Sequence, residues 1–314
     1  MTKFLYRFSV LSAFILLMMF SGCKPIEIGQ PMDTTDSSFA SAVKKSGILT
    51  SDEVWSGKIL VDGDITIPKG NVVTIESGTI IRFAKGTKMI VDGTLLANGQ
   101  VNRAITLTSN ESNPQPGDWG GIIFSESSQN SRIEYCVLQF HTQIICRSDS
   151  LRLNDSIIAE GSSAGIVIEA SSPTIEDNMI TNNAIGIICD KSSAPNINHN
   201  AITSSLADGI ECKGSSYPSI SFNVISNNRK NGIYCLGASS PEIVSNNITY
   251  NGSWAVYGGG KLTSNYIRGN REQGMDAVDT GQTLSGSQYQ GVENVDAPRS
   301  SPVPDAGVRK KERW

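Results

Sequence analysis

The chain has 314 residues and a formal net charge of −4. This length exceeds that of most compact domains, so the fold must either divide or grow by addition of similar units. A slightly acidic chain lacks the basic surface that nucleic acid requires, which excludes nucleic acid as an expected partner.

The N-terminus has the features of a secretion signal. Basic residues precede an apolar stretch at residues 10–20, which is too short for a comfortable membrane span. The sequence Ser21-Gly22-Cys23 that follows resembles the end of a bacterial lipobox. We therefore expect residues 1–22 to be a lipoprotein signal peptide and lipid chains on Cys23 to anchor the protein in the cell envelope, at the outer membrane. The alternative is an ordinary cleaved signal peptide followed by a chance cysteine.

The next segment, residues 23–50, is polar and rich in Ser, Thr and Asp. This composition predicts a flexible tether between the anchor and the folded part. Within it, residues 38–45 have the pattern of a short amphipathic helix that would cap the first turn of the fold.

A repeated phrase occupies the centre of the chain. A Gly-Ile pair is followed by a proline, and an isoleucine, an asparagine and a second isoleucine stand two, five and seven places after the proline. The prolines are Pro173, Pro195, Pro218 and Pro241. The period of 21 to 23 residues lies in the range that is typical of solenoid proteins.

Each repeat contains two short apolar segments separated by Ser, Pro, Asn and Gly, which predicts strands joined by turns. No segment of the repeat has the apolar spacing of a helix, and the leucines that a leucine-rich repeat needs are nearly absent from it. Strand-only repeats that stack in parallel form a β-helix. We therefore predict an all-β fold, a parallel β-helix over residues 51–272.

Alternation along the strands predicts the columns of the core. One inward column is expected to contain Ile166, Ile187, Ile210, Ile233 and Val256, and a second Cys146, Ile168, Cys189, Cys212 and Cys235. Stacked thiols point in parallel, which is poor geometry for a disulfide, so we expect reduced cysteines that act as small apolar residues. No Cys-x-x-Cys spacing is present, which argues against a zinc site.

An asparagine recurs at one corner of the repeat. Its positions are Asn178, Asn200, Asn223, Asn246 and Asn265. Asparagine tolerates the left-handed backbone of a tight corner, and stacked amides can hydrogen-bond along the fold axis. Beyond the repeats, residues 273–314 are rich in Gly, Ser, Gln and Pro and predict a disordered tail, with its basic end at 309–311 in solvent.

These features carry a resemblance to a known superfamily. The Asn-x-Ile-x-x-Asn spacing followed by Gly-Ile resembles the repeat of the pectin-lyase-like superfamily, which the copper-maturation periplasmic proteins and alginate epimerases share. A second segment resembles one that is common in bacterial β-helix lipoproteins, Gly117-Asp118-Trp119-Gly120-Gly121-Ile122. The resemblance implies a right-handed, single-stranded parallel β-helix. It implies no particular activity, because lyases, epimerases, adhesins and inert spacers share this fold.

The outward positions of the first strand in each repeat supply the candidate site. They place the following side chains on adjacent turns: Glu169, Asp190, Glu211, Lys213, Tyr234 and Tyr257. Pectate-lyase-like enzymes use carboxylates to hold Ca²⁺ and a basic residue to remove a proton. The resemblance thus implies that Glu169 and Asp190 could hold calcium and that Lys213 could be the base, with the tyrosines under a sugar ring. The alternative is a surface charge ladder that pairs Arg147 with Glu169 and Asp190 with Lys213.

Other catalytic signatures are absent from the sequence. The Asp-Asp pair and the Gly-His-Gly of polygalacturonase-like enzymes are missing, and His141 and His199 are expected to be polar turn residues. Glu176 and Asp177 are neighbours in sequence, so they should point in different directions and not form a facing acid/base pair. We expect a non-catalytic envelope protein without cofactor that binds or displays a glycan or protein ligand. The alternative is a polysaccharide lyase or epimerase that acts on acidic sugars with calcium.

Overall fold

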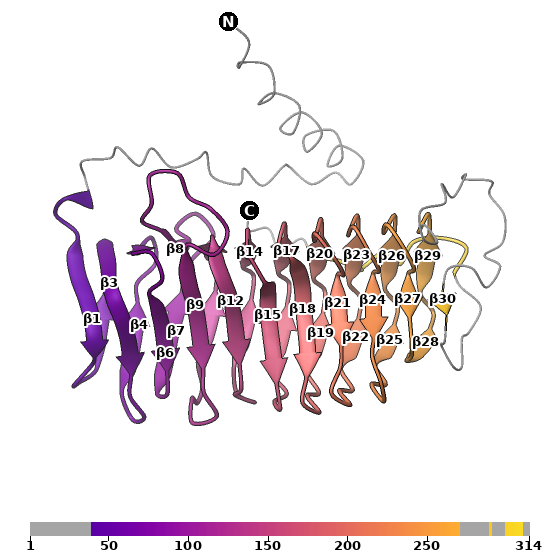
Figure 1. Cartoon of the computed structure of the whole chain (residues 1–314), viewed down its shortest axis with the longest axis horizontal. Helices are drawn as coiled ribbons and strands as arrows, with labels where there is room; N and C mark the ends of the chain where they lie inside the picture. Colours follow the sequence, from indigo (N-terminus) through magenta and orange to yellow (C-terminus); the bar gives the residue numbers. More distant parts are fainter. Residues whose placement is uncertain (1–38, 271–288, 291–298, 310–314) are drawn as a thin grey trace, which may run out of the picture.

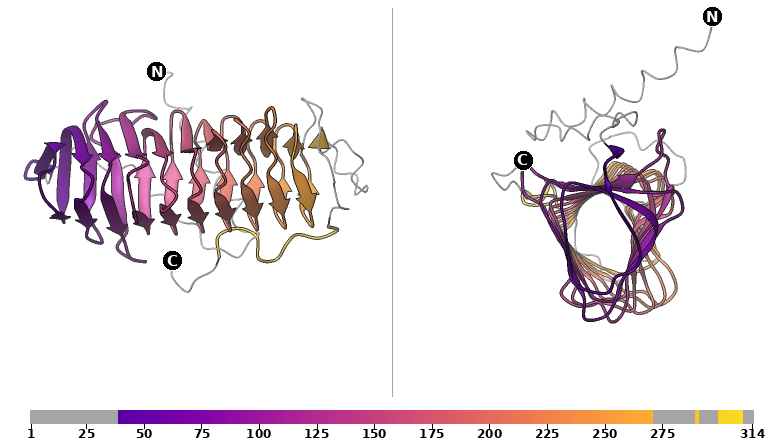
Figure 2. Two further views of the ribbon diagram at one scale, coloured as in Figure 1. Left: turned by 90° about the horizontal axis from the view of Figure 1, so that it is seen from below. Right: turned by 90° about the vertical axis from the view of Figure 1, so that its left-hand side faces the viewer.

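The chain forms an elongated parallel β-solenoid (Figure 1). The computed structural model describes residues 39–270, 289–290 and 299–309, and every named element in these ranges is a strand. Within them, no helix is long and apolar enough to cross a membrane. Viewed along its axis, the solenoid has three sides that enclose one continuous core (Figure 2). The prediction of an all-β parallel β-helix is confirmed.

Each turn of the solenoid contributes strands to three faces, which we call A, B and C. Face A contains the first halves of β1 (Val43–Ile48) and β3 (Lys58–Ile67), then β5 (Ile80–Phe83), β8 (Ile105–Ser109), β11 (Cys136–Gln139), β14 (Ile157–Ala159), β17 (Met179–Thr181), β20 (Ala201–Thr203), β23 (Val224–Ser226), β26 (Asn247–Thr249) and β29 (Tyr266–Arg268). Face B contains the second halves of β1 and β3, then β6 (Lys88–Val91), β9 (Trp119–Phe124), β12 (His141–Cys146), β15 (Ala164–Glu169), β18 (Ile185–Asp190), β21 (Ile210–Cys212), β24 (Ile233–Cys235), β27 (Val256–Tyr257) and β30 (Tyr289–Gln290). Face C contains β2 (Glu53–Trp55), β4 (Val72–Ile75), β7 (Thr94–Asn98), β10 (Arg132–Glu134), β13 (Arg152–Asn154), β16 (Thr174–Glu176), β19 (Asn196–Asn198), β22 (Ser219–Ser221), β25 (Glu242–Val244) and β28 (Lys261–Thr263).

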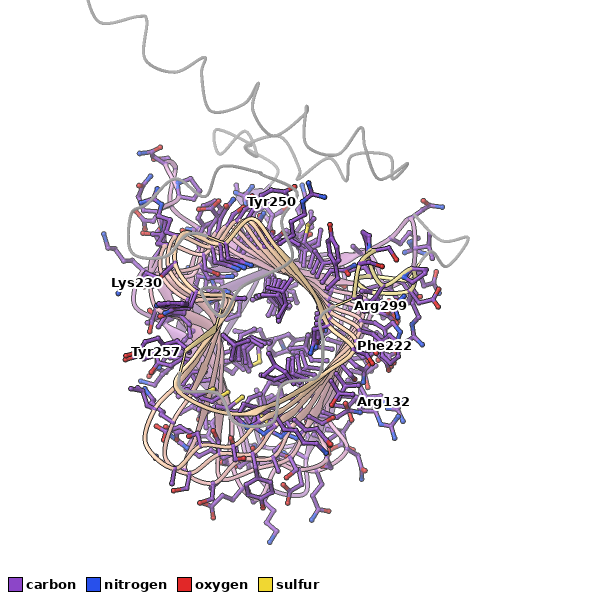
Figure 3. The ribbon with its side chains drawn as sticks, turned by 90° about the vertical axis from the view of Figure 1, so that its right-hand side faces the viewer. Arg132, Phe222, Lys230, Tyr250, Tyr257 and Arg299 are labelled. Carbon is purple, nitrogen blue, oxygen red and sulfur yellow. The ribbon has the colours of Figure 1, made fainter. Side chains whose placement is uncertain are left out.

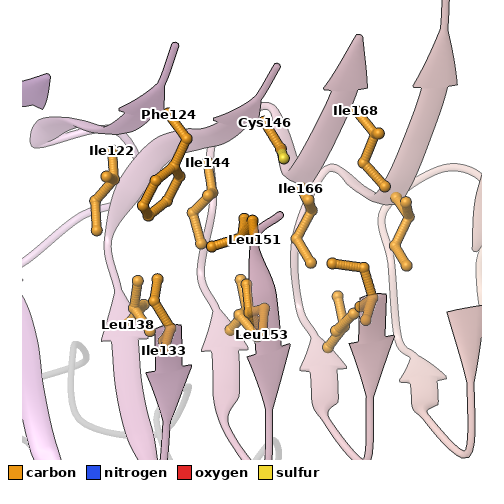
Figure 4. Packing of buried hydrophobic residues seen from close by; sticks show 14 of the residues in the cluster. Ile122, Phe124, Ile133, Leu138, Ile144, Cys146, Leu151, Leu153, Ile166 and Ile168 are labelled. Atoms are coloured by element: carbon orange, nitrogen blue, oxygen red, sulfur yellow. The ribbon is translucent and has the colours of Figure 1, made fainter. Parts of the chain in front are cut away.

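The strand register confirms the predicted columns of the core. On face B, Cys189 is in register with Cys212, and Cys212 with Cys235. Isoleucines are also in register, as Ile122, Ile144 and Ile166 are on three neighbouring turns (Figure 4), whereas the column beside them changes from Phe124 to Cys146 to Ile168. The five cysteines of the described ranges are free and buried, as predicted. Apolar burial of this kind is the main stabilising contribution in a fold that contains short strands.

The predicted asparagine ladder lines the corner between faces C and A. The Oδ1 atom of Asn223 accepts hydrogen bonds from the backbone and side-chain nitrogens of Asn200, at 2.9 and 3.1 Å. The backbone part of the prediction is wrong. The left-handed residue is the one before each asparagine, with φ of 54–56°: Asp177, His199, Phe222, Ser245 and Ser264. The corner therefore bends one residue earlier, and the asparagine turns its amide inward.

A second asparagine ladder, which was not predicted, lies at the corner between faces A and B. The Asn251 Oδ1 atom accepts hydrogen bonds from the backbone and side-chain nitrogens of Asn228, at 3.2 and 2.9 Å. The Asn270 Oδ1 atom accepts the same two hydrogen bonds from Asn251. Gly161 and Ser205 stand at two positions of this column. Because these two positions do not carry asparagine, the ladder does not stand out in the sequence.

The solenoid begins earlier than predicted. Strand β1 starts at Val43 and pairs with β3, so residues 43–48 belong to the fold and not to a tether that ends at residue 50. The helix expected over residues 38–45 is wrong for the same reason, since Val43–Lys45 is extended and pairs with β3. The ion pair between Lys45 Nζ and Glu53 Oε2, at 2.6 Å, fixes this first turn. The signal peptide and Cys23 lie outside the described residues.

The C-terminal part is also more ordered than predicted. Strand β30 pairs with β27 as a further rung of face B. Residues 299–309, which we call the strap, lie along the flank of the solenoid, where Val303 is buried (Figure 2, left). The prediction of disorder over residues 273–314 is wrong for both segments, because their backbone groups find hydrogen-bond partners that composition does not reveal. The remaining residues of that range lie outside the described part.

Candidate functional site

The six candidate residues lie on the outer surface of face B, near the C-terminal half of the solenoid. Register places Glu169 beside Asp190, and Glu211, Tyr234 and Tyr257 on three successive turns. The structure divides the candidates into a charged group and an aromatic group.

The charged group consists of local ion pairs. The Glu169 carboxylate lies 2.8 Å from Arg147 Nε and 3.0 Å from Lys191 Nζ. Partial burial alone would raise the pKa of Glu169, but the hydrogen bonds from Arg147 and Lys191 lower it below its usual value. Lys213 Nζ lies 3.2 Å from Glu211. The predicted pairing of Arg147 with Glu169 is confirmed, whereas the pairing of Asp190 with Lys213 is wrong because Glu211 is the nearer partner.

These contacts bear on the calcium hypothesis. Asp190 Oδ1 accepts a hydrogen bond from the backbone nitrogen of Lys191 at 2.7 Å, and two cations neutralise Glu169. Across the described residues, no three His, Cys, Asp or Glu side chains are grouped to hold a metal ion. A calcium ion at Glu169 and Asp190 would have to displace the existing partners.

The aromatic group lies beyond the charged group on the last turns. The ring centroids of Tyr234 and Tyr257 are 5.5 Å apart at an interplanar angle of 44°. Trp254 adds a third ring, 6.4 Å from that of Tyr257. Contacts of this kind produce an apolar surface with polar groups at its edge.

A shallow pocket of about 280 Å³ opens beside these rings. Its lining residues come from three successive turns: Asp208, Lys230, Asn231, Tyr234, Ser253, Trp254 and Tyr257. Tyr257 and Lys230 lie on one flank of the solenoid (Figure 3). Its volume suits one sugar ring or a similar small group rather than a whole drug-sized molecule.

Asp208 is the buried acid of this pocket. It is 5% exposed, and its Oδ1 atom accepts hydrogen bonds from the backbone and side-chain nitrogens of Asn231, at 2.9 and 2.7 Å. Burial raises the pKa of Asp208, and the hydrogen bonds from Asn231 oppose this shift only in part. Asn231 Oδ1 in turn accepts from the backbone nitrogen of Trp254 at 3.1 Å. This chain of hydrogen bonds fixes the pocket wall.

The indole nitrogen of Trp254 is a hydrogen-bond donor without a partner. Trp254 is 6% exposed, and its Nε1 atom is buried and makes no hydrogen bond. A buried unpaired donor is costly, and such groups commonly mark a place where a ligand or water binds. Trp254 lines the pocket with other atoms of its ring, and its N–H group lies beneath the surface.

Sequence reasoning missed Asp208, Asn231 and Trp254. Each stands directly before a small residue of face B (Gly209, Gly232 and Ala255), and earlier repeats carry Ala164 and Ile185 at the same position. The available signal was the change from apolar to polar side chains at Asp208 and Asn231 and to a large aromatic side chain at Trp254. It appears only when the repeats are aligned by register.

The two histidines have different settings. His199 lies at a turn, as predicted, and its ring stacks on Phe222 with a centroid distance of 5.1 Å. The prediction for His141 is wrong, since it lies in β12, is fully buried and has no hydrogen-bond partner for either ring nitrogen. Burial lowers the pKa of His141 to about 4. Its ring occupies space that Gly161 leaves free, because a Cβ atom there would lie 2.9 Å from His141 Cε1.

Comparison with protein families gives a match over most of the solenoid. The model described as periplasmic copper-binding protein (NosD) matches residues 105–298. The chain belongs to the NosD family. A second model, the pectate-lyase like β-helix domain, matches residues 47–135 of this NosD-family chain. No curated protein matches it.

Structures of the periplasmic alginate epimerase AlgG are among the solved structures that this chain resembles. One mutant of AlgG has a TM-score of 0.52 at 13% identity, with 78% of this chain and 76% of that chain covered. A second AlgG structure has a TM-score of 0.40 at 14% identity and covers 82% of this chain and 76% of that chain. At this identity the likeness concerns the fold alone.

The description of the NosD family names copper. Copper prefers cysteine, methionine and histidine ligands, and a cysteine ligand must be a thiolate. Burial raises the pKa of Cys136 to about 12 and of Cys146 to about 11, which keeps these thiols protonated. His141 is enclosed in the core, and the described ranges contain no cluster of three His, Cys, Asp or Glu residues. The described side chains therefore do not fit a copper site.

Proposed function

We propose that this protein binds carbohydrate in the pocket of face B and performs no chemistry there, as a lipid-anchored protein of the cell envelope. The observation that carries the proposal is the group of neighbouring aromatic rings in the pocket wall, Tyr234 and Tyr257 tilted at 44° to each other with Trp254 beside them. Aromatic faces pack against the C–H faces of sugars, while a few fixed polar groups select the hydroxyls. Asp208 and Lys230 supply such groups.

The proposed location rests on two independent indications. The family model and the AlgG structures both describe periplasmic proteins. The Ser21-Gly22-Cys23 sequence resembles a lipidation site, which favours anchoring of the chain in a membrane, with the outer membrane as our proposal. A rigid solenoid on such an anchor would hold its ligand, a glycan or a partner envelope protein, away from the lipid surface.

The test is a binding measurement on soluble fragments of envelope and capsular polysaccharides by titration calorimetry. Tyr234→Ala and Tyr257→Ala should each weaken binding at least about tenfold, equivalent to roughly 1.4 kcal/mol. Tyr217→Ala is the matched control, because Tyr217 is 58% exposed and does not line the pocket. Equal binding by all three variants and the unchanged protein would contradict the proposal.

The second candidate is a polysaccharide lyase or epimerase that acts on acidic sugars. This activity is favoured by three side chains on one face, Glu169, Asp190 and Lys213, although Lys213 already forms an ion pair with Glu211. A calcium-dependent rise in ultraviolet absorbance with pectate or alginate, abolished by Lys213→Ala, would establish the lyase. We expect no such rise from the unchanged protein.

A further inference from the structure

The pocket of face B contains a carboxylate oxygen that the described residues leave without a hydrogen bond. Asp208 Oδ1 accepts both hydrogen bonds from Asn231, one from the backbone nitrogen and one from the side chain. The other oxygen, Oδ2, receives none from the described residues, and solvent reaches it. Because Asp208 lines the pocket and is only 5% exposed, this oxygen is a largely desolvated acceptor that a ligand can reach.

A positive charge on the ligand would suit this oxygen best. Burial raises the pKa of Asp208, because the carboxylate is poorly solvated there. An ammonium group would donate to the carboxylate and offset its charge, and such a charge-assisted hydrogen bond is stronger than one from a neutral hydroxyl. The rings of Tyr234, Tyr257 and Trp254 add to this preference, because the face of an aromatic ring attracts a cation.

The charges around Asp208 are of both signs. Lys230 stands on the next turn, lines the same pocket and favours the charged form of Asp208, whereas Glu211 opposes it. Glu211 is already paired with Lys213, at 3.2 Å. Lys230 forms no ion pair within the described part of the chain. It would repel a ligand that carries only a positive charge, so the pocket suits a ligand that also carries an acidic group.

The strap does not cover this pocket. Arg299 of the strap lies on the flank opposite Tyr257 (Figure 3). The other charged end of the strap, Arg309, bonds to Asp177 Oδ1 at 3.0 Å and to Glu176 Oε1 at 2.6 Å. These two carboxylates were expected to diverge, yet both reach one guanidinium. The charges of the strap are therefore engaged away from the pocket.

We propose that the ligand of the pocket is an amino sugar that also carries an acidic group, with its ammonium at Asp208 Oδ2 and its acidic group at Lys230. The inference rests on the proposed carbohydrate-binding function and names the class of sugar. Acetylation of the amine would remove its charge and leave Asp208 with a neutral amide as its donor. The pocket therefore distinguishes a free amino sugar from its acetylated form.

The test compares four kinds of sugar by titration calorimetry on the full chain in detergent. The first is glucosamine phosphate, with the phosphate on the primary or the anomeric hydroxyl. The others are the matching N-acetylglucosamine phosphate, the matching glucose phosphate, and glucosamine itself. At least one isomer of glucosamine phosphate should bind about tenfold more tightly than each of the three comparison sugars, because each of these lacks one of the two charges.

Two variants assign the charges to their partners. Asp208→Asn keeps an Oδ1 acceptor for Asn231 and replaces Oδ2 by an amide donor, and Asn231 shows that asparagine fits the equivalent place one turn later. This variant should lose the preference for the free amine without a lower unfolding midpoint. Lys230→Met, at an exposed position, should lose the preference for the phosphate. Glu242→Gln, which removes an exposed carboxylate on face C, should keep both preferences.

The outcomes separate this inference from the proposed function. Equal binding of the free and the acetylated amine, or a preference for the free amine that survives Asp208→Asn, would overturn the inference. So would a preference for the phosphate that survives Lys230→Met. The proposed function would remain if sugars or polysaccharide fragments still bind and Tyr234→Ala weakens their binding, whereas it would fall with the inference if no carbohydrate binds.

Discussion

One atom of Asn200 satisfies two donors of Asn178. Asn200 Oδ1 lies 3.0 Å from the backbone nitrogen and 3.0 Å from the side-chain nitrogen of Asn178, one turn earlier. Asn200 Nδ2 donates in turn to the carbonyls of Ile175 and Asn198, each at 2.9 Å. The amide therefore replaces the backbone partners that a corner residue lacks, and it does so in the buried interior.

The first prediction concerns this ladder. Asn200→Ala would leave at least two buried backbone groups without partners, at about 1–3 kcal/mol each, so we expect a loss of roughly 2–5 kcal/mol in the free energy of unfolding. Asn196→Ala, at an exposed position on the adjacent strand β19, should change it by less than about 0.5 kcal/mol. Urea unfolding followed by circular dichroism measures both, and equal midpoints for the two variants would contradict the structural role of the ladder.

The second prediction concerns the cysteine column. Cys212→Ser would bury a hydroxyl between Cys189 and Cys235, at a cost of about 1–3 kcal/mol. Cys212→Val should be tolerated better, because the site accepts a small apolar side chain. Thiol titration under denaturing conditions should find all the described cysteines free, and any disulfide among them would refute this assignment.

The third prediction concerns acid sensitivity. Burial holds the pKa of His141 at about 4, below its usual value of 6.5, so the unfolded chain binds this proton more readily. The contribution of the neutral ring is complete above pH 6.5 and is lost as the pH falls toward 4, by up to roughly 3 kcal/mol. His141→Asn removes the titrating imidazole. It also places an asparagine at a position that belongs to the column of the second asparagine ladder. The difference in unfolding free energy between the two proteins should change between pH 7 and 4, and a constant difference would refute the assignment.

The fourth prediction concerns the anchor. Cys23→Ser should release the protein from membranes or leave its precursor unprocessed, because no thiol remains to carry the lipid. Fractionation of cells and metabolic labelling with palmitate measure these outcomes. Absence of label on the unchanged protein would show that the signal peptide is of the ordinary kind.

The sequence by itself determined the solenoid. Its period, its alternating strands and its in-phase residues give a core in which each side chain sits over its equivalent, as Cys189, Cys212 and Cys235 do. In a solenoid, each repeat packs against its neighbours through equivalent positions. The period of the sequence therefore already tells which side chains pack together. The outward tyrosines, Tyr234 and Tyr257, followed from the same alternation.

The contacts and sites that depart from the repeat were decided only by the tertiary structure. The strap contacts Asp177 from 132 residues away, and no local pattern encodes a contact of that separation. The carboxylate partner of Lys213 depended on side-chain reach, because Glu211 and Asp190 are both near in sequence or register. The pocket brings together Asp208 and Trp254 from different turns. His141 is buried because Gly161 leaves room for its ring. These outcomes depend on shape and distance in three dimensions, whereas periodicity records only which residues face inward.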